Sequence, residues 1–319
     1  MYEKYNYMSL TRYEFDILSF VEENGEKCYG WRELSDSLSI SGTTVTDTKK
    51  TLIERKLLKN DNEKLSVSED GLKELEPYRV KRAVIFAAGF GSRMMPVTLT
   101  TPKPLVEVKG IRIIDRLIDA LVAKDIKDIT IVRGYLKEKF NVLLDKYPFI
   151  TLLDNDHYDK ENNISSALIA GEKIDQCYIC AGDLLVTNPK IIKKYNYCSN
   201  YLASYAEETD DWCFTFENGY TGEYKKGGKY CFNQYEIAYW NKEDSAKLRR
   251  DFKKAYETEE NGKDLFWEFI PLVLYHDQYH VEIRQCSRAD IMEIDNFYEL
   301  CEVDLKYKDY EKSRNKQEI

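Results

Sequence analysis

The hydrophobic pattern of the chain changes near residue 80, and this change constrains the fold more than any other feature. From Arg82 the sequence runs RAVIFAAG, a continuous apolar segment typical of a parallel strand that is buried on both faces. Strand-like segments then alternate with helical ones, such as residues 113–123, whose apolar side chains share one helical stripe. This alternation predicts an α/β fold, a doubly wound sheet that binds its ligand at the carboxyl ends of its strands.

The elements of this sheet can be placed along the chain. We expect strands at residues 128–134, 149–155 and 177–186, and helices at 135–147 and 163–174. After about residue 200 the chain is rich in aromatic side chains, and the segments ASYAEE, WCFTF and YEIAYW are strand-like. We expect them to extend the sheet into a mixed one and to add a lid. Residues 80–319 are therefore predicted to form one domain.

Residues 1–79 have a shorter, helical pattern and are predicted to form a separate small domain. Residues 31–58 indicate a helix, a tight turn at Gly42 and a second helix, and a small hairpin and a last short helix follow. This arrangement resembles the winged helix-turn-helix of bacterial transcriptional regulators. The resemblance places five side chains on or near a groove-reading helix: Thr43, Thr44, Thr46, Lys49 and Lys50. Acidic side chains outnumber basic ones by four here, which weakens a role in binding DNA. A scaffold or dimerisation role, and with it a homodimer, remains open.

Composition excludes several classes of protein. A net charge of −9 argues against a general nucleic-acid binder, although a few local cations and amides suffice to bind a nucleotide. No run approaches the roughly 18 apolar residues that span a membrane, and the first residues lack the apolar core of a signal peptide. We therefore expect a cytoplasmic protein whose eight cysteines are reduced.

Two pairs of residues with metal-like spacing are better explained without a metal. Cys177 and Cys180 lie in a strand-like segment, where residues three apart point to opposite faces, so buried thiols are expected. His276 and His280 have no third ligand nearby in the sequence.

The glycines that follow the first buried strand are typical of a phosphate-binding loop. The loop has neither the ending of a Walker motif nor the third glycine of a dinucleotide fingerprint. Gly89 and Gly91 allow the backbone to bend and present N–H groups to phosphate oxygens. Arg93 adds a fork of donors, and the two prolines that flank Lys103 restrain its backbone. Together these groups suit a nucleoside triphosphate whose leaving group is pyrophosphate.

The segment AAGFGSRMMPVTLTTPKPL resembles the signature of the nucleotidyltransferases that activate sugar phosphates or choline phosphate. The segments VRGYLKEKF, NNISSAL, AGDLLV, DLFWEF and MEIDNFYEL follow in the order found in the bacterial CTP:phosphocholine cytidylyltransferases. The resemblance covers about residues 82–304 and implies a Rossmann-like nucleotidyltransferase fold. It does not extend to residues 1–79.

The resemblance also implies roles for particular residues. Arg93, Lys103 and Asp183 would be catalytic, and the cofactor would be Mg²⁺ held by Asp183 and Asp295, with Glu293 as a weaker candidate. The alternatives are a strand-terminal turn for Asp183 and a helix N-cap for Asp295. The implied nucleotide-binding residues are Ala87, Ala88, Gly89, Phe90, Gly91, Ser92, Gly134, Tyr135, Asn163, Ser165 and Ser166. For Asn163 and Ser165, capping of the following helix is an equal alternative, and Asn162 belongs to the same segment.

The acceptor is predicted from aromatic residues late in the chain. A trimethylammonium group cannot donate a conventional hydrogen bond, so proteins hold it with aromatic faces and carboxylates. Trp212, Phe266, Trp267 and Glu268 supply such a set, which Asp264 extends; packing of these rings in the core is the alternative. The sequence thus predicts that CTP and phosphocholine are converted into CDP-choline and pyrophosphate.

Two other functions remain open. A nucleotidyltransferase for a sugar 1-phosphate, or for another zwitterionic phosphate or phosphonate, is one, and the aromatic and acidic set disfavours the sugar. A nucleotide-sensing, DNA-binding regulator is the other, and the presence of Arg93, Lys103 and Asp183 disfavours it. The sequence does not decide between CTP and UTP.

Overall fold

The computed structural model of this 319-residue chain describes residues 10–308. By its internal contacts the chain divides into two units. The first comprises Met1–Arg79 and Lys194–Tyr197, and the second comprises Val80–Lys193 and Cys198–Ile319. The membership of Lys194–Tyr197 in the first unit has no counterpart in the division expected from the sequence.

The first unit contains helices and a small antiparallel sheet. Its elements are α1 (Arg12–Asn24), β1 (Lys27–Cys28), α2 (Trp31–Leu38), α3 (Gly42–Glu54), β2 (Leu58–Asp61), β3 (Lys64–Val67) and α4 (Glu69–Leu75). The strand order is β1-β3-β2. α1 begins with a capping box in which Thr11 and Glu14 satisfy each other's backbone N–H groups. The helix pair and the hairpin expected from the sequence are present, whereas the role suggested by their resemblance to a winged helix stays a prediction.

The second unit is built around one large sheet. Its strands are β4 (Arg82–Ala87), β5 (Glu107–Val108), β6 (Ile111–Arg112), β7 (Asp128–Arg133), β8 (Thr151–Asp154), β9 (Cys177–Ala181), β10 (Leu184–Val186), β11 (Asn200–Glu217), β12 (Tyr220–Trp240), β13 (Glu282–Gln285) and β14 (Ile291–Glu293). Its helices are α5 (Ile113–Val122), α6 (Val142–Lys146), α7 (Ile164–Ala170), α8 (Lys242–Thr258) and α9 (Phe297–Val303).

The large sheet is mixed. Its strand order is β11-β13-β12-β9-β4-β7-β8. β9, β4, β7 and β8 are parallel to one another, whereas β12 runs antiparallel to β9. The α/β fold with a mixed sheet, predicted from the alternation of strands and helices, is confirmed.

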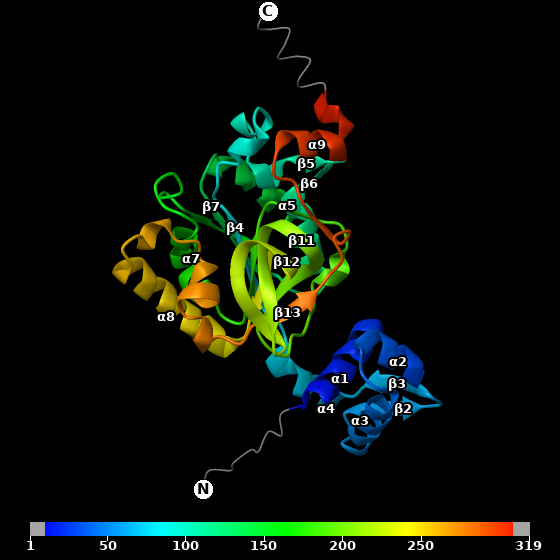
Figure 1. The fold of residues 1–319 in the computed structure, drawn as a ribbon. Coiled ribbons are helices and arrows are strands. Elements are labelled where there is room, and N and C mark those ends of the chain that lie inside the picture. The colour runs from blue at the N-terminus through cyan, green and yellow to red at the C-terminus, as the bar shows by residue number, and fades with distance from the viewer. Residues whose placement is uncertain (1–9, 309–319) are drawn as a thin grey trace, which may run out of the picture. The chain divides into compact units, whose positions relative to one another are not determined.

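Both faces of the sheet are covered, as expected of a doubly wound fold. In β4, Ile85 belongs to the core cluster that includes α5, and the adjacent Val84 belongs to the cluster that includes α7 and α8. Figure 1 shows α7 and α8 together on one side of the sheet and α5 on the other. Cys177 and Cys180 lie in opposite clusters, and all eight cysteines are free, as predicted.

A long hairpin extends the sheet. β11 has 18 residues and β12 has 21, and they turn at Asn218 and Gly219, both of which have positive φ angles. Asn-Gly is the preferred pair for such a two-residue turn. Register shifts, among them one between Thr209 and Trp212, interrupt the ladder without ending either strand.

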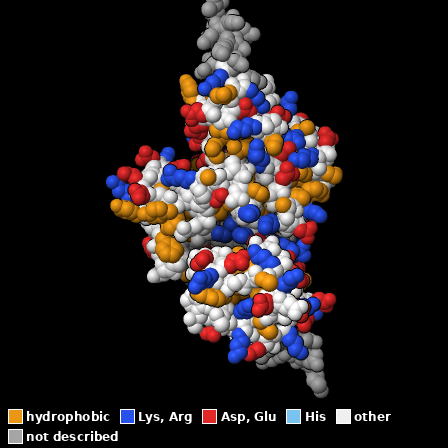
Figure 2. Space-filling view, turned by 90° about the vertical axis from the view of Figure 1, so that its right-hand side faces the viewer, with side chains coloured by type: hydrophobic (Ala, Val, Ile, Leu, Met, Phe, Trp, Pro, Cys, Tyr) orange, Lys and Arg blue, Asp and Glu red, His pale blue; other side chains and the backbone are white. Residues whose placement is uncertain are grey.

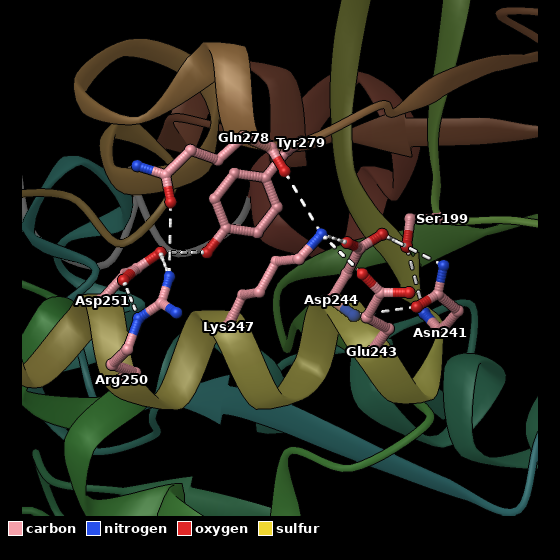
Figure 3. A network of polar contacts seen from close by, with 9 residues as sticks. All are labelled: Ser199, Asn241, Glu243, Asp244, Lys247, Arg250, Asp251, Gln278 and Tyr279. Carbon is pink, nitrogen blue, oxygen red and sulfur yellow. Dashed lines mark hydrogen bonds and ion pairs between the residues drawn. The ribbon is translucent and has the colours of Figure 1, made fainter.

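α8 is fixed at its start and along its length by a polar network (Figure 3). Asn241 caps the helix by accepting a hydrogen bond from the backbone N–H of Asp244 at 2.8 Å. The hydroxyl of Tyr279 donates to Asp251 at 2.7 Å, and Lys247 donates to the carbonyl of Gln278 at 3.3 Å. The network holds α8 against residues 278–279, at the end of the segment that follows the helix.

The surface carries charges of both signs, and the helices are short or polar. Acidic and basic side chains are interspersed over the face drawn in Figure 2. Among residues 10–308, no helix is both long and apolar enough to cross a bilayer.

Candidate active site

A cavity of about 460 Å³ lies where β4, β8 and β9 end. This is the edge of the sheet at which doubly wound folds bind their ligands. The cavity is lined by residues 86–93, Lys103, Pro104, Asn155, Tyr158, Glu161, Asn162, Asn163, Ser166, Ala181, Asp183, Glu236, Phe266 and Asp295. The glycine loop, Arg93, Lys103 and both predicted metal-binding aspartates, which are far apart in the sequence, are therefore brought to one place.

The glycine loop is shaped by close packing against Lys103. Gly91 has a φ of 62°, in the left-handed region, and a Cβ atom there would lie 2.9 Å from the Cβ of Lys103. Its carbonyl accepts a hydrogen bond from the hydroxyl of Thr98 at 2.9 Å. Gly89 is different, because a Cβ there would meet no atom within 4 Å. Gly91 is thus required by the fold of the loop, whereas Gly89 leaves open space on the cavity side.

Gly91→Ala is expected to lower the free energy of unfolding by about 1–2 kcal/mol relative to Gly89→Ala. The left-handed conformation is unfavourable for alanine by about that amount, and the new methyl group would also displace Lys103. Chemical denaturation of the two variants measures the difference. Equal stabilities would show that the loop does not depend on this conformation.

Two cations and two carboxylates form a continuous ion-pair network in the cavity. The Nζ atom of Lys103 lies 2.8 Å from Asp183 Oδ2 and 3.6 Å from Asp295 Oδ1. Arg93 donates two hydrogen bonds to Asp295, at 2.9 Å and 3.0 Å. Lys103 is only 6% exposed, whereas the side chain of Arg93 is 69% exposed. Lys103 is therefore a fixed charge, and Arg93 is free to exchange its partner for a ligand.

The helix N-cap alternative does not fit Asp295, whereas Asp183 does lie in a turn at the end of a strand and still contacts Lys103. The residue that caps α9 is Asn296, whose side chain accepts from the backbone N–H groups of Tyr298 and Glu299, so Asp295 is not the cap. Asp183 lies between β9 and β10, and its carboxylate makes the shortest contact with Lys103 in the network. Both aspartates thus direct their charge into the cavity.

The pKa values follow from this crowding of charge. Burial lowers the pKa of Lys103, but the carboxylates of Asp183 and Asp295 raise it by more, so the ammonium keeps its proton. Burial raises the pKa of Glu293 to about 8, and repulsion from Asp295 and Asp183 adds to the effect. These surroundings favour the neutral form of Glu293, and Asp183 and Asp295 are the two carboxylates that contact Lys103.

The donor set fits a Mg²⁺ ion that is shared with a ligand. Mg²⁺ prefers oxygen ligands and keeps several waters, so one or two carboxylates and the phosphates of a nucleotide are a sufficient set. Asp183 and Asp295 both lie within 4 Å of one ammonium nitrogen, so a single positive charge already sits between them. Among residues 10–308 no group of three His, Cys, Asp or Glu side chains is arranged to hold a metal by itself.

The segment before α7 is tied to neighbouring loops. Asn163 occupies the N-cap position but makes no capping bond; its Oδ1 accepts from the backbone N–H of Trp267 at 2.8 Å. Ser165 and Ser166 are buried and accept hydrogen bonds from Asn155 at 3.0 Å and 2.9 Å. Neither Asn163 nor Ser165 caps the helix, and Asn163 and Ser166 line the cavity while Ser165 supports it.

Gly134 and Tyr135 lie behind the glycine loop. The backbone N–H of Tyr135 donates to the carbonyl of Ala88 at 3.0 Å, and a Cβ on Gly134 would come within 2.8 Å of the same oxygen. The ring centroids of Tyr135 and Tyr158 each lie 5.2 Å from that of Phe90, and they lie 6.5 Å from each other. These three rings form an aromatic cluster at the glycine loop, although Gly134 and Tyr135 do not line the cavity themselves.

The prediction that Trp267 belongs to an aromatic cage for the acceptor is wrong. Trp267 is 1% exposed, and its ring packs in the core between the sheet and α8. Its ring neighbours there are Phe86, Tyr201, Trp240 and Phe252.

The other members of that set are divided between the cavity and its surroundings. Trp212 stacks on Tyr224 at 5.0 Å and does not line the cavity. Phe266 lines the cavity and is 46% exposed, and Glu268 is buried beside it. Asp264 contributes its backbone carbonyl to Asn162.

Six residues that line the cavity were not identified as site residues from the sequence: Phe86, Asn155, Tyr158, Glu161, Ala181 and Glu236. Asn155 directly follows β8, so its position at the carboxyl end of a parallel strand was a usable signal. Glu236 lies within a strand-like segment of mixed composition, and nothing local distinguishes it.

Known proteins with a similar sequence or fold are nucleotidyltransferases. Residues 82–217 match the family described as nucleotidyl transferase. The chain is 34% identical over 230 residues to a 2-aminoethylphosphonate cytidylyltransferase of Lancefieldella rimae, covering 70% of this chain and 92% of that protein. It is 28% identical over 217 residues to a choline-phosphate cytidylyltransferase of Haemophilus influenzae, covering 67% and 92%.

The fold agrees with these similarities. The structure of the CTP:phosphocholine cytidylyltransferase of Streptococcus pneumoniae superposes with a TM-score of 0.66 at 29% identity, covering 71% of this chain and 98% of that one. A glycine loop, two cations and two aspartates at the carboxyl edge of a mixed sheet are the features of an enzyme that transfers nucleotidyl groups. The chain belongs to the nucleotidyl transferase family, among its cytidylyltransferases.

Proposed function

We propose that this enzyme transfers the cytidylyl group of CTP, with Mg²⁺, to a small acceptor that carries a phosphate or phosphonate at one end and an ammonium at the other. Phosphocholine, the acceptor favoured by the sequence, and 2-aminoethylphosphonate both have this form. The observation that carries the proposal is the network in which Lys103 and Arg93 meet Asp183 and Asp295 beside the glycine loop.

In the unliganded protein, the two cations that a triphosphate would contact are already paired with carboxylates. In the unliganded protein the carboxylate of Asp295 neutralises Arg93. A triphosphate on the glycine loop offers Arg93 an alternative partner of higher charge, because a guanidinium binds phosphate oxygens in the same bidentate way as it binds the carboxylate of Asp295. Arg93 would then leave Asp295, and both aspartates would face the metal, which offsets the charge of the phosphates when it is bound.

The chain's own groups then position the reaction. An oxygen of the acceptor's phosphate or phosphonate attacks the α-phosphorus of CTP, and the bond from that phosphorus to the bridging oxygen of pyrophosphate breaks. Backbone N–H groups of residues 89–92 and Arg93 stabilise the negative charge of the leaving group. Lys103, which its buried position fixes, stabilises charge on the phosphoryl oxygens around the reacting phosphorus. No general base is required, since the attacking dianion is already nucleophilic.

A matrix of substrates tests the proposal. Pyrophosphate release is measured with each of four nucleoside triphosphates and with phosphocholine, phosphoethanolamine, 2-aminoethylphosphonate and glucose 1-phosphate, in the presence of Mg²⁺. We expect release with CTP and the acceptors that carry an ammonium group. Release with glucose 1-phosphate alone, or with none of the acceptors, would reject the proposal.

Arg93→Gln is expected to raise the KM for CTP by about tenfold and to change the KM for the acceptor much less. Hydrogen bonds to charged groups contribute about 1.5–3 kcal/mol to binding. We take the lower value, about 1.5 kcal/mol, because the side chain of Arg93 is exposed in the unliganded protein. Steady-state kinetics with each substrate varied in turn measures both constants. An equal rise in the two KM values would place Arg93 outside the triphosphate site.

A further inference from the structure

A second acidic group lies on the side of Asp183 that faces away from the glycine loop. In the sheet, β12 neighbours β9, and β9 in turn neighbours β4, which carries the loop. β12 is antiparallel to β9, and Ile237 of β12 pairs with Cys180 of β9. The next residue back along β12, Glu236, therefore lies opposite the end of β9, two residues before Asp183. Glu236 lines the cavity there. If the triphosphate occupies the β4 side, the β12 side is left for the acceptor.

Glu236 has a buried acidic neighbour, Glu268. The two carboxyl groups repel each other electrostatically, and burial together with that repulsion raises the pKa of Glu236 well above its usual value. Glu268 is 2% exposed, and burial raises its pKa to about 7. One oxygen of Glu268, Oε2, accepts a hydrogen bond from Asn163 at 3.3 Å.

The other oxygen of Glu268 has no hydrogen bond of normal geometry, although it is buried. The hydroxyl of Tyr201, which is fully buried and interacts electrostatically with Glu268, also lacks a partner. Buried polar groups are nearly always satisfied, and an unfilled acceptor on a carboxyl group is costly. These two groups form an incomplete polar site, and the carboxyl group of Glu268 in it interacts electrostatically with that of Glu236.

The available cations do not complete this site. Lys103 and Arg93, the two cations that line the cavity, are paired with Asp183 and Asp295. A sugar phosphate would bring further negative charge and no compensating cation. An ammonium group, in contrast, would neutralise the acid pair and donate hydrogen bonds to it.

The chemistry of the acid pair differs from that of an aromatic cage. A primary ammonium has three N–H donors, which carboxylate oxygens satisfy. A trimethylammonium has none and depends on aromatic faces and on the charge of nearby carboxylates. Of the three rings expected to supply such faces, only that of Phe266 lines the cavity, because Trp267 is in the core and Trp212 lies outside the lining.

Building on the proposed function, we infer that Glu236 and Glu268 bind the ammonium end of the acceptor and select a primary ammonium over a trimethylammonium. The preferred substrates are then aminoalkyl phosphonates or phosphates. Glu236 contacts the ammonium from the cavity wall, and Glu268, whose other oxygen accepts from the cavity-lining Asn163, supplies its unpaired oxygen Oε1.

Two pairs of acceptors test the inference, because the members of each pair differ only in three N-methyl groups. They are phosphoethanolamine with phosphocholine, and 2-aminoethylphosphonate with its N-trimethyl analogue. In the wild-type enzyme, in the pair that gives the higher turnover, we expect kcat/KM to be at least about tenfold higher for the primary amine than for its trimethylated partner. This difference corresponds to about 1.4 kcal/mol. A preference for the trimethylated member of both pairs would overturn the inference, and the proposed function would stand.

Glu268→Gln and Glu236→Gln test the residues. Each is expected to lower kcat/KM for the primary amine by about 10- to 100-fold, the range for hydrogen bonds to charged groups, and to change kcat/KM for the trimethylated acceptor and the KM for CTP far less. Glu236→Gln keeps the test decisive if Glu268→Gln does not fold, because Glu236 is only partly buried. Equal losses for both members of a pair would overturn the assignment. Absence of pyrophosphate release from CTP with every acceptor would instead reject the proposed function itself.

Discussion

Asp183→Asn is expected to lower kcat by about 10³-fold while the protein stays folded. Asp183 lies between β9 and β10 and lines the cavity, where its carboxylate is 2.8 Å from Lys103. The amide keeps the size of the side chain but removes the negative charge that a Mg²⁺ ion and Lys103 would share. Loss of a group that stabilises charge in a phosphoryl-type transition state typically lowers the rate by about 10²–10³-fold, and loss of a metal ligand adds to it. Pyrophosphate release at saturating CTP and acceptor measures the effect.

Asp119→Asn is the matched control for this prediction. Asp119 lies on α5, pairs with Lys146 at 2.9 Å, and is absent from the cavity lining. The control should therefore lose a surface ion pair and keep wild-type turnover, because exposed pairs contribute little to stability. If Asp183→Asn turned over at a rate near that of the control, Asp183 would have no part in the mechanism.

The parallel part of the fold was predictable because its signals are local. The run RAVIFAAG is apolar at every position that β4 buries, and alternate residues serve the two opposite core clusters. The same logic placed Cys177 and Cys180 on opposite faces of β9, which the structure confirms. Continuous apolar strands followed by amphipathic helices leave few other arrangements.

The hairpin of β11 and β12 was predictable only in pieces. The segments ASYAEE and WCFTF were expected as separate strands, but both lie in the single strand Asn200–Glu217. Register shifts carry the ladder past the intervening acidic residues, and such bulges depend on the partner strand, which local patterns do not report. Likewise, no local signal assigns Lys194–Tyr197 to the first unit, because that membership arises from contacts distant in sequence.

The candidate site divides in the same way. The glycine loop, Arg93, Lys103 and the two aspartates form recognisable motifs, and the structure brings them together. Trp267 was misplaced because a tryptophan beside Phe266 in sequence points away from it in space, into the core. Composition shows that aromatic side chains are abundant, but only packing shows which of them reach a cavity.

Lys103→Met is expected to lower kcat by about 10³-fold and also to destabilise the fold, by about 2–3 kcal/mol. Lys103 is 6% exposed and is the shared cation of Asp183 and Asp295. Its removal leaves two neighbouring carboxylates with less compensation in a partly buried site. Breaking a buried ion pair from one side costs about 3–5 kcal/mol, and the partial exposure of the aspartates reduces that figure. Urea denaturation and pyrophosphate release give the two effects separately.

The double variant Lys103→Met/Asp183→Asn separates charge balance from catalysis. Removing the charge of Asp183 relieves the repulsion that the lost ammonium leaves behind, so the double variant should be more stable than Lys103→Met alone. Its activity should remain as low as that of either single variant, because residues that act on one transition state are not additive. A double variant no more stable than Lys103→Met would mean that the 2.8 Å contact is not what makes the ammonium necessary to the fold. Recovery of activity would mean that Lys103 serves only to neutralise Asp183, and the role of Lys103 at the reacting phosphorus would have to be abandoned.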